Sequence, residues 1–134
     1  MSVETVFLHG GVYVHRIASG DVTGQDFMAA DNELLAMPEQ LAKCRYVIMD
    51  FTSISRMNIS ASDVRQIADL EQRMAAVQPH VTVAIVAPTD VAFGMSRMWE
   101  VLAEKTGWET MVFRTRPEAE EWVGRKSEGP ALHP

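Results

Sequence analysis

Two short, almost unbroken apolar runs constrain the fold of this chain more than any other feature. One is YVIMDF at Tyr46–Phe51, and the other is VTVAIVA at Val81–Ala87. Neither run alternates regularly with polar residues, which is typical of strands covered by helices on both faces of a parallel sheet. We therefore predict that both runs are central strands, and that ligands or partners bind beyond their carboxyl ends, as in other open α/β sheets.

The segments around these runs alternate between strand and helix patterns. Val3–Leu8 and Val12–Ala18 flank the glycine pair of His9-Gly10-Gly11, which predicts a hairpin. Both faces of the second of these strands are mixed, because His15 and Arg16 fall on opposite sides, and this favours a place at the sheet edge. A last short strand is predicted at Glu109–Phe113, and the predicted helices cover about Gly24–Met37, Ser60–Gln78, Val91–Thr106 and Thr115–Val123.

Three segments break these patterns. Ser19–Val22 interrupts the second strand, Pro38 ends the first helix or begins a short further turn, and Thr52–Asn58 has no periodicity and is predicted to be a loop. The order of elements predicts an α/β fold with a single mixed, mostly parallel sheet of about five strands and about four helices, distributed over both faces. Residues 1–123 are predicted to form one domain, followed by a loose polar tail at residues 124–134.

Composition excludes several classes of function. Twelve Lys and Arg residues against eighteen Asp and Glu residues give a formal charge of −6, and the basic residues are scattered, which argues against nucleic-acid binding. The single cysteine, Cys44, excludes an internal disulfide and favours a reducing compartment. No apolar run approaches the roughly 20 residues of a membrane span, and the N-terminus does not resemble a signal peptide. We therefore expect a cytoplasmic protein without a membrane partner.

Motifs for catalysis, cofactors and metals are missing from the sequence. It contains no GxxxxGK[ST], GxGxxG or GxSxG pattern. His9 and His15 have no third ligand at a suitable spacing, so they are expected to be strand histidines and not metal ligands. We predict no catalytic residue, no metal and no cofactor, and thus a protein that is not an enzyme.

Ser60 is the most informative polar residue, because it precedes a predicted helix as part of Ser60-x-x-Asp63. Free backbone N–H groups and the positive end of the helix dipole favour an added anion there, so Ser60 is a candidate phospho-acceptor or anion contact. The simpler alternative is that Ser60 only caps the helix, since serine is among the best capping residues.

The same residues resemble the STAS domains, named for sulfate transporters and anti-sigma-factor antagonists and also called SpoIIAA-like. In that family, an apolar strand leads through a short loop to Asp-Ser-[Ser/Thr]-Gly at the start of a helix, and the second hydroxyl residue is phosphorylated by a partner kinase. Met49–Phe51 corresponds to the strand end and Asn58–Ala61 to the motif, of which Ser60 keeps the hydroxyl group. Divergent stand-alone bacterial proteins of this type are similar at Gly20–Thr23, Ile59–Asp63 and Val86–Gly94.

The resemblance implies a SpoIIAA-like fold and a regulatory or protein-interaction module, switched by phosphorylation or anion binding at Ser60. An anti-sigma-factor-like or kinase-like protein is the implied partner, and a homodimer is left open. The alternative is a domain that binds a small apolar or anionic metabolite. An enclosed apolar cavity of roughly 300 Å³ or more with converging polar groups would favour the ligand, whereas a flat face at the start of the Ser60 helix would favour a protein partner.

The predicted interaction surface surrounds Ser60. Thr52–Asp63 and Pro88–Phe93 follow the carboxyl ends of neighbouring predicted strands and are therefore expected to be spatial neighbours. Arg56 and Arg65 are candidate charge partners of an anion, while Asp63 and Asp90 are expected to be helix-start carboxylates. The full set of predicted surface residues is Asp50, Thr52, Ser53, Ser55, Arg56, Asn58, Ser62, Asp63, Arg65, Asp90 and Phe93.

Overall fold

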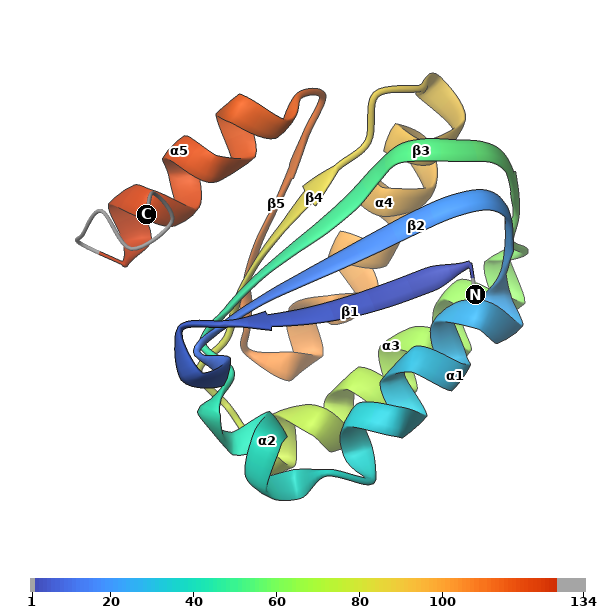
Figure 1. Ribbon diagram of the computed structural model, residues 1–134. Helices are drawn as coiled ribbons and strands as arrows, with labels where there is room; N and C mark the ends of the chain where they lie inside the picture. The colour runs from blue at the N-terminus through green and yellow to red at the C-terminus, as the bar shows by residue number, and fades with distance from the viewer. Residues whose placement is uncertain (1, 128–134) are drawn as a thin grey trace.

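The computed structural model describes residues 2–127 and shows one five-stranded sheet with helices on both faces (Figure 1). The strands lie in the order β1-β2-β3-β4-β5, with β1 antiparallel to β2 and every other pair parallel. The predicted single, mixed and mostly parallel sheet is therefore confirmed. The elements are β1 (Val3–Leu8), η1 (His9–Gly11), β2 (Tyr13–Thr23), α1 (Gly24–Leu35), α2 (Pro38–Lys43), β3 (Tyr46–Asn58), α3 (Ala61–Val77), β4 (Thr82–Val86), α4 (Asp90–Leu102), η2 (Ala103–Thr106), β5 (Glu109–Phe113) and α5 (Arg116–Lys126).

The helices are distributed unequally over the two faces of the sheet. α1, α2, α3 and α4 lie on one face and α5 lies alone on the other (Figure 1). The larger core joins the sheet to the α1, α3 and α4 side chains, and the smaller core joins it to Ala119, Trp122 and Val123 of α5. The prediction of helices on both faces is correct, and the large core on the α1 side is where a cavity can form.

The two apolar runs form adjacent parallel strands in the interior of the sheet, as predicted. β3 pairs with β4 from Tyr46↔Thr82 to Asp50↔Val86, and β5 continues the sheet beyond β4. Almost every side chain of β4 is buried, because helices cover both of its faces. The carboxyl ends of β3 and β4 thus reach the same edge of the sheet.

Two segments that lacked strand patterning are strands in the structure. β2 continues through Ser19–Thr23 and β3 through Thr52–Asn58, and these extensions pair with each other in parallel, from Ser19↔Ser53 to Thr23↔Asn58. Irregularities in the register near Ser19 and Gly20 interrupt the alternation of apolar and polar residues. The loop prediction for Thr52–Asn58 was wrong because backbone pairing with β2 forms the strand despite its polar sequence.

The predicted hairpin of the first two strands is confirmed and lies at an edge of the sheet. Within it β1 is the edge strand, whereas β2 pairs with β1 on one side and with β3 on the other, so the mixed faces of the second strand do not mark an edge. Arg16 is buried and His15 half-buried, so the polar residues that suggested an edge face protein on both sides of the sheet. Their partners, described below, explain why a central strand tolerates them.

The helices differ from the prediction in number and ends. Residues 2–127 contain five α-helices, because Pro38 begins the separate short helix α2 after α1 ends at Leu35. α5 continues through Gly124 to Lys126, so the first residues of the predicted tail are helical, whereas residues 128–134 lie outside the described part. An ion pair of 2.9 Å from Arg125 Nη1 to Glu121 Oε1, one turn earlier, supports this extra turn.

Candidate functional site

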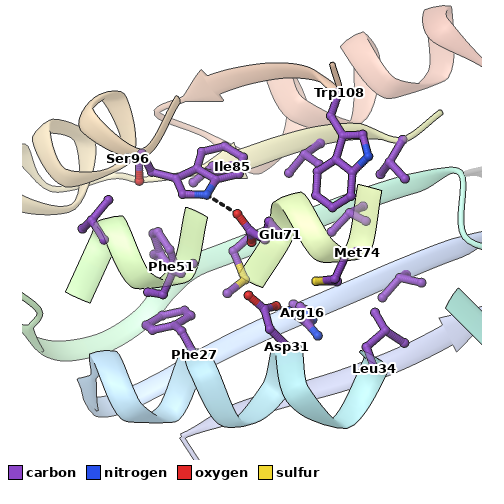
Figure 2. Close-up of a pocket in the computed structure, with 18 of the residues that line it drawn as sticks. Arg16, Phe27, Asp31, Leu34, Phe51, Glu71, Met74, Ile85, Ser96 and Trp108 are labelled. Atoms are coloured by element: carbon purple, nitrogen blue, oxygen red, sulfur yellow. Dashed lines mark hydrogen bonds and ion pairs between the residues drawn. The ribbon is translucent and has the colours of Figure 1, made fainter. Parts of the chain in front are cut away.

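A cavity of about 110 Å³ lies between the sheet and the helices α1, α3 and α4 (Figure 2). Its wall is mostly apolar and includes Phe27, Phe51 and Ile85. Four polar side chains also line it, one from each of four elements: Arg16 of β2, Asp31 of α1, Glu71 of α3 and Ser96 of α4. Polar side chains from separate elements that meet in an apolar cavity are typical of small-molecule sites.

Arg16 and Asp31 form a buried ion pair at this cavity. Their exposed fractions are 7% and 1%. Arg16 Nη1 donates to Asp31 Oδ1, and Arg16 Nη2 donates to the Ala30 carbonyl oxygen at 2.8 Å. A charge in such a place is tolerated only when it is paired and hydrogen-bonded, and both conditions are met for Arg16.

Glu71 lies next to this pair and receives a hydrogen bond from the indole N–H of Trp99 at Oε1, the dashed line in Figure 2. Burial, reinforced by the negative charge of Asp31, raises the pKa of Glu71 well above its ordinary value. Burial also raises the pKa of Asp31, but the Arg16 guanidinium opposes that rise. Because Arg16 donates directly to Asp31, the geometry favours a negative charge on Asp31 and a proton on Glu71.

The carboxyl groups of Asp31 and Glu71 lie close enough to influence each other. Two ionised carboxylates at such a distance repel each other, so a proton on one of them stabilises the pair. No donor in residues 2–127 reaches Asp31 Oδ2. One hydrogen bond thus joins Trp99 of α4 to Glu71 of α3, and another joins Arg16 of β2 to Asp31 of α1.

Ser96 adds a second buried oxygen without a partner. Its exposed fraction is 3%, it lines the cavity, and Oγ has no hydrogen-bond partner among the described residues. A buried hydroxyl group left unpaired costs about 1–3 kcal/mol, so most such groups in proteins find a partner. The hydroxyl of Ser96 is therefore a group that a bound molecule can satisfy.

Cys44 contributes to the apolar part of the wall. Burial raises the pKa of its thiol to about 11, so the side chain is neutral at physiological pH and is not an activated nucleophile. Trp99 and Trp108 also line the cavity, and the indole N–H of Trp108 donates to the Gln78 carbonyl oxygen at 2.9 Å. Both indoles are suitable spectroscopic reporters of this space.

Ser60 lies outside the cavity, exposed at the start of α3. Its Oγ accepts from the Asp63 backbone N–H at 3.0 Å, and Asp63 Oδ2 accepts from the Ser60 backbone N–H at 3.0 Å. This reciprocal capping box confirms the predicted helix start. The side chain is exposed, but its role as an acceptor in the helix cap is enough to explain a serine at this position without any modification.

The structure divides the remaining residues of the predicted surface between the two faces of the sheet. Asp50 points away from α3 and pairs with Arg116 of α5 at 2.8 Å. Asp90 pairs with Arg114 at 2.9 Å, and the Arg114 guanidinium lies 4.1 Å from the ring centre of the half-buried Phe93. The exposed members on β3 and the first turns of α3 are Thr52, Ser53, Ser55, Arg56, Asn58, Ser62 and Arg65.

A second polar cluster joins α5 to the sheet around Arg116. This side chain donates to Asp50, and to Glu120 Oε2 at 3.1 Å, and lies 3.1 Å from His15 Nδ1. Arg116 and two hydrogen bonds from Thr52 to the carboxylate lower the pKa of Asp50 against the effect of burial, while burial lowers the pKa of His15. The cluster holds α5 in place, and we assign it no ligand.

Two kinds of site are not found in residues 2–127. No three His, Cys, Asp or Glu side chains are placed so that they could hold a metal ion. No helix of that part of the chain is both long and apolar enough to cross a membrane.

The sequence analysis missed the four polar residues of the cavity, although a signal was present. Asp31 shares a helical face with Phe27 and Leu34, and Arg16 alternates with the buried Val14 in β2. A charged residue at a position where the pattern calls for an apolar one indicates a buried partner or a binding site. The identity of that partner depends on tertiary structure and could not be derived from spacing.

Comparison with known proteins supports the architecture. No family model and no curated protein matches this chain. A solved structure from Shewanella loihica PV-4, described as an uncharacterized protein of the DUF3478 family with a SpoIIAA-like fold, superposes with a TM-score of 0.58, covering 90% of this chain and 91% of the other. The chain has a SpoIIAA-like fold. At 18% identity the likeness shows the fold alone, which agrees with the resemblance to a divergent STAS domain.

Proposed function

We propose that this SpoIIAA-like protein is a non-enzymatic binding module that holds a small molecule in the cavity between α1, α3, α4 and the sheet. The observation that carries the proposal is the pair of buried, unsatisfied oxygens, Asp31 Oδ2 and Ser96 Oγ, in an otherwise apolar wall. Each lowers the stability of the empty protein and would be compensated by a ligand with hydrogen-bonding groups.

The cavity limits the size of the ligand. Its volume of about 110 Å³ is below the 300 Å³ expected of a metabolite site, so the buried oxygens without a partner, and not the volume, favour a ligand. An apolar cavity of roughly 150 Å³ is enough to bind benzene. We therefore expect a compact molecule, or the short apolar end of a longer one.

The polar groups of the cavity do not support catalysis. Asp31 is neutralised by Arg16, Glu71 is hydrogen-bonded by Trp99, and the thiol of Cys44 is protonated. No activated nucleophile faces the space in the described part of the chain, and there is little room for a substrate together with a water molecule. These features support a binding function without a reaction.

The test has two steps. Native mass spectrometry of freshly purified protein should show a retained small molecule or, for empty protein, the unliganded mass. Titration with n-butanol, followed by NMR of the Trp99 and Trp108 indole N–H signals, should then show saturable binding. Val83→Phe fills the cavity wall and should abolish that binding, whereas Val101→Phe, on an exposed site of α4, should not.

The two variants keep the result interpretable. Overpacking at Val83 should cost about 1–3 kcal/mol, so a denaturant curve must first show that Val83→Phe is folded. Binding that is unchanged in folded Val83→Phe would place the ligand elsewhere and would refute the proposal. Failure of small neutral, cationic and anionic probes alike to bind, in protein shown to be empty, would also refute it.

A protein-contact function at the start of α3 is a second candidate, carried by the exposed hydroxyl of Ser60 in its capping box. An anti-sigma-factor-like or kinase-like partner would modify or contact this group. Phosphopeptide analysis of the protein isolated from the cells that make it is the test. Unmodified Ser60 under all growth conditions would leave only the capping role.

A further inference from the structure

The charges around the cavity indicate the chemical class of its ligand, and this inference rests on the binding function proposed above. We propose that the cavity selects a short apolar primary amine, bound as its ammonium ion between Asp31 and Glu71. Its N–H groups would donate to Asp31 Oδ2 and to the Glu71 carboxylate, and its hydrocarbon part would contact the apolar wall.

The count of charges favours a cation over other ligands. Among the described residues, the groups that interact with the carboxyl pair are Arg16 from β2 and Trp99 from α4. In the empty protein Arg16 balances the charge of Asp31, and a proton on Glu71 leaves that carboxyl group neutral. An ammonium ion would supply a second positive charge and three donors, so that Glu71 could be ionised as well.

Other ligand classes fit less well. A carboxylate or phosphate would meet Asp31 directly, and the guanidinium of Arg16, the one that lines the cavity among residues 2–127, is already paired. Bringing a second anion into a low-dielectric space without a new cation is strongly unfavourable. A neutral alcohol can donate one hydrogen bond to Asp31 Oδ2, but it brings no positive charge to the carboxyl pair. The alcohol is therefore the appropriate comparison, and it should bind more weakly.

The size of the cavity determines how long the probe molecules should be. A volume of about 110 Å³ is somewhat smaller than the roughly 150 Å³ that accommodates benzene, which suits an unbranched hydrocarbon chain of about four carbons. n-Butylamine, n-butanol and n-butyrate are matched in length and differ only in the polar end. They separate the contribution of charge from that of apolar contact.

Binding of the ammonium ion should be linked to proton release. n-Butylamine is already protonated at neutral pH, so Glu71 must lose its proton when the ion binds between the carboxylates. The balance is one ammonium ion taken up and about one proton released to the buffer for each site. Below the pKa of Glu71, affinity should therefore increase up to about tenfold for each unit rise in pH, and the increase should stop once Glu71 is ionised.

The experiment is calorimetric titration of the full chain with the three probes in two buffers of different ionisation enthalpy. We expect n-butylamine hydrochloride to bind at least about tenfold more tightly than n-butanol near neutral pH, with about one proton released, and n-butyrate not to bind. Glu71→Gln should remove the preference for the amine and the proton release. Asp69→Asn makes the same acid-to-amide change on an exposed position of α3 and should retain both.

The outcomes distinguish this inference from the function on which it rests. Equal or tighter binding of n-butanol, or an amine affinity unchanged by Glu71→Gln, overturns the ammonium inference while small-molecule binding stands. Absence of binding by all three probes overturns the proposed function and this inference together.

Discussion

Two substitutions that look alike in the sequence should have opposite effects on stability. Glu71→Gln and Asp31→Asn each replace a carboxyl group at the cavity with an amide. We expect Glu71→Gln to be neutral or stabilising near neutral pH, and Asp31→Asn to be strongly destabilising. The difference tests the assignment of the proton to Glu71.

The expected changes in the free energy of unfolding follow from the partners that each substitution keeps or loses. In Glu71→Gln the amide oxygen can accept from the Trp99 indole, and the amide nitrogen is available to donate to Asp31 Oδ2, so no buried partner is lost. Asp31→Asn removes the counter-ion of Arg16 and leaves a guanidinium buried at 7% exposure. Breaking a buried pair in this way costs about 3–5 kcal/mol, a large part of the roughly 5–15 kcal/mol that stabilises a typical domain.

The pH dependence has a definite sign. Burial in the folded protein raises the pKa of Glu71 above its ordinary value of 4.5, so the folded state binds a proton that the unfolded state has lost. The stabilisation is complete below that value and is lost as the pH rises towards the pKa in the folded state, by about 1.4 kcal/mol for each pH unit. Glu71→Gln has no such proton, so its stability relative to the wild type should increase with pH over this window.

Urea unfolding followed by tryptophan fluorescence and circular dichroism, at several pH values between about 5 and 8, provides the measurement. Asp69→Asn is the control for a loss of negative charge on the same helix. If Glu71→Gln lowers the free energy of unfolding as much as Asp31→Asn at every pH, then Glu71 is ionised in the folded protein and the reasoning is refuted.

Three further predictions concern single residues, each measured as the free energy of unfolding in urea. Ser60→Ala should lose about 1 kcal/mol because the helix cap is removed, whereas Ser60→Asp should keep most of it. Ser96→Ala should raise stability by up to about 1 kcal/mol because Oγ has no partner, whereas Thr106→Val should lower it by about 1–3 kcal/mol because that buried hydroxyl makes two hydrogen bonds. Gly24→Ala should be destabilising, because the added Cβ would lie 2.4 Å from Asp63 Cγ.

Each of these predictions has a contradicting result. A full loss of the cap energy in Ser60→Asp would show that a carboxylate cannot replace the hydroxyl there. A destabilised Ser96→Ala would mean that Oγ has a partner in solution, for example an ordered water molecule. A fully stable Gly24→Ala would show that the starts of α1 and α3 can move apart at no cost.

The sequence predicted the parts of the fold in which local pattern and tertiary environment agree. β4 is buried on both faces, and its unbroken apolar run leaves little alternative to an interior parallel strand. The starts of α1 and α3 were also correct, because a capping box is a local structure whose residues are three positions apart. The resemblance to STAS domains gave the same fold from a different argument.

The prediction failed where a distant segment decides the local structure. In the run Ser53-Ile54-Ser55-Arg56 only Ile54 is typical of a strand, and the segment becomes a strand because β2 lies beside it. His15 and Arg16 suggested a solvated edge strand, whereas Arg116 and Asp31 provide partners for them on the two faces of the sheet. A polar residue in a sequence indicates that its side chain needs a polar partner. The sequence pattern alone does not show whether that partner is water or a buried charge.

The end of β3 connects the cavity to the surface around Ser60. Met57 and Ile59 line the cavity and are half-buried, while the alternate residues Asn58 and Ser60 are exposed. This alternation follows from the strand geometry, and it means that one short stretch of backbone presents both the cavity wall and the predicted contact surface. A ligand that contacts Met57 and Ile59 would therefore bias the position of Asn58 and Ser60.

Such coupling between the cavity and the surface at Ser60 must be reciprocal. If the ligand changes the affinity of the protein for its partner by some factor, the partner changes the affinity of the protein for the ligand by the same factor. The two candidate functions are then compatible, and measuring ligand affinity in Ser60→Asp, which alters the surface without touching the cavity, would show whether they are linked.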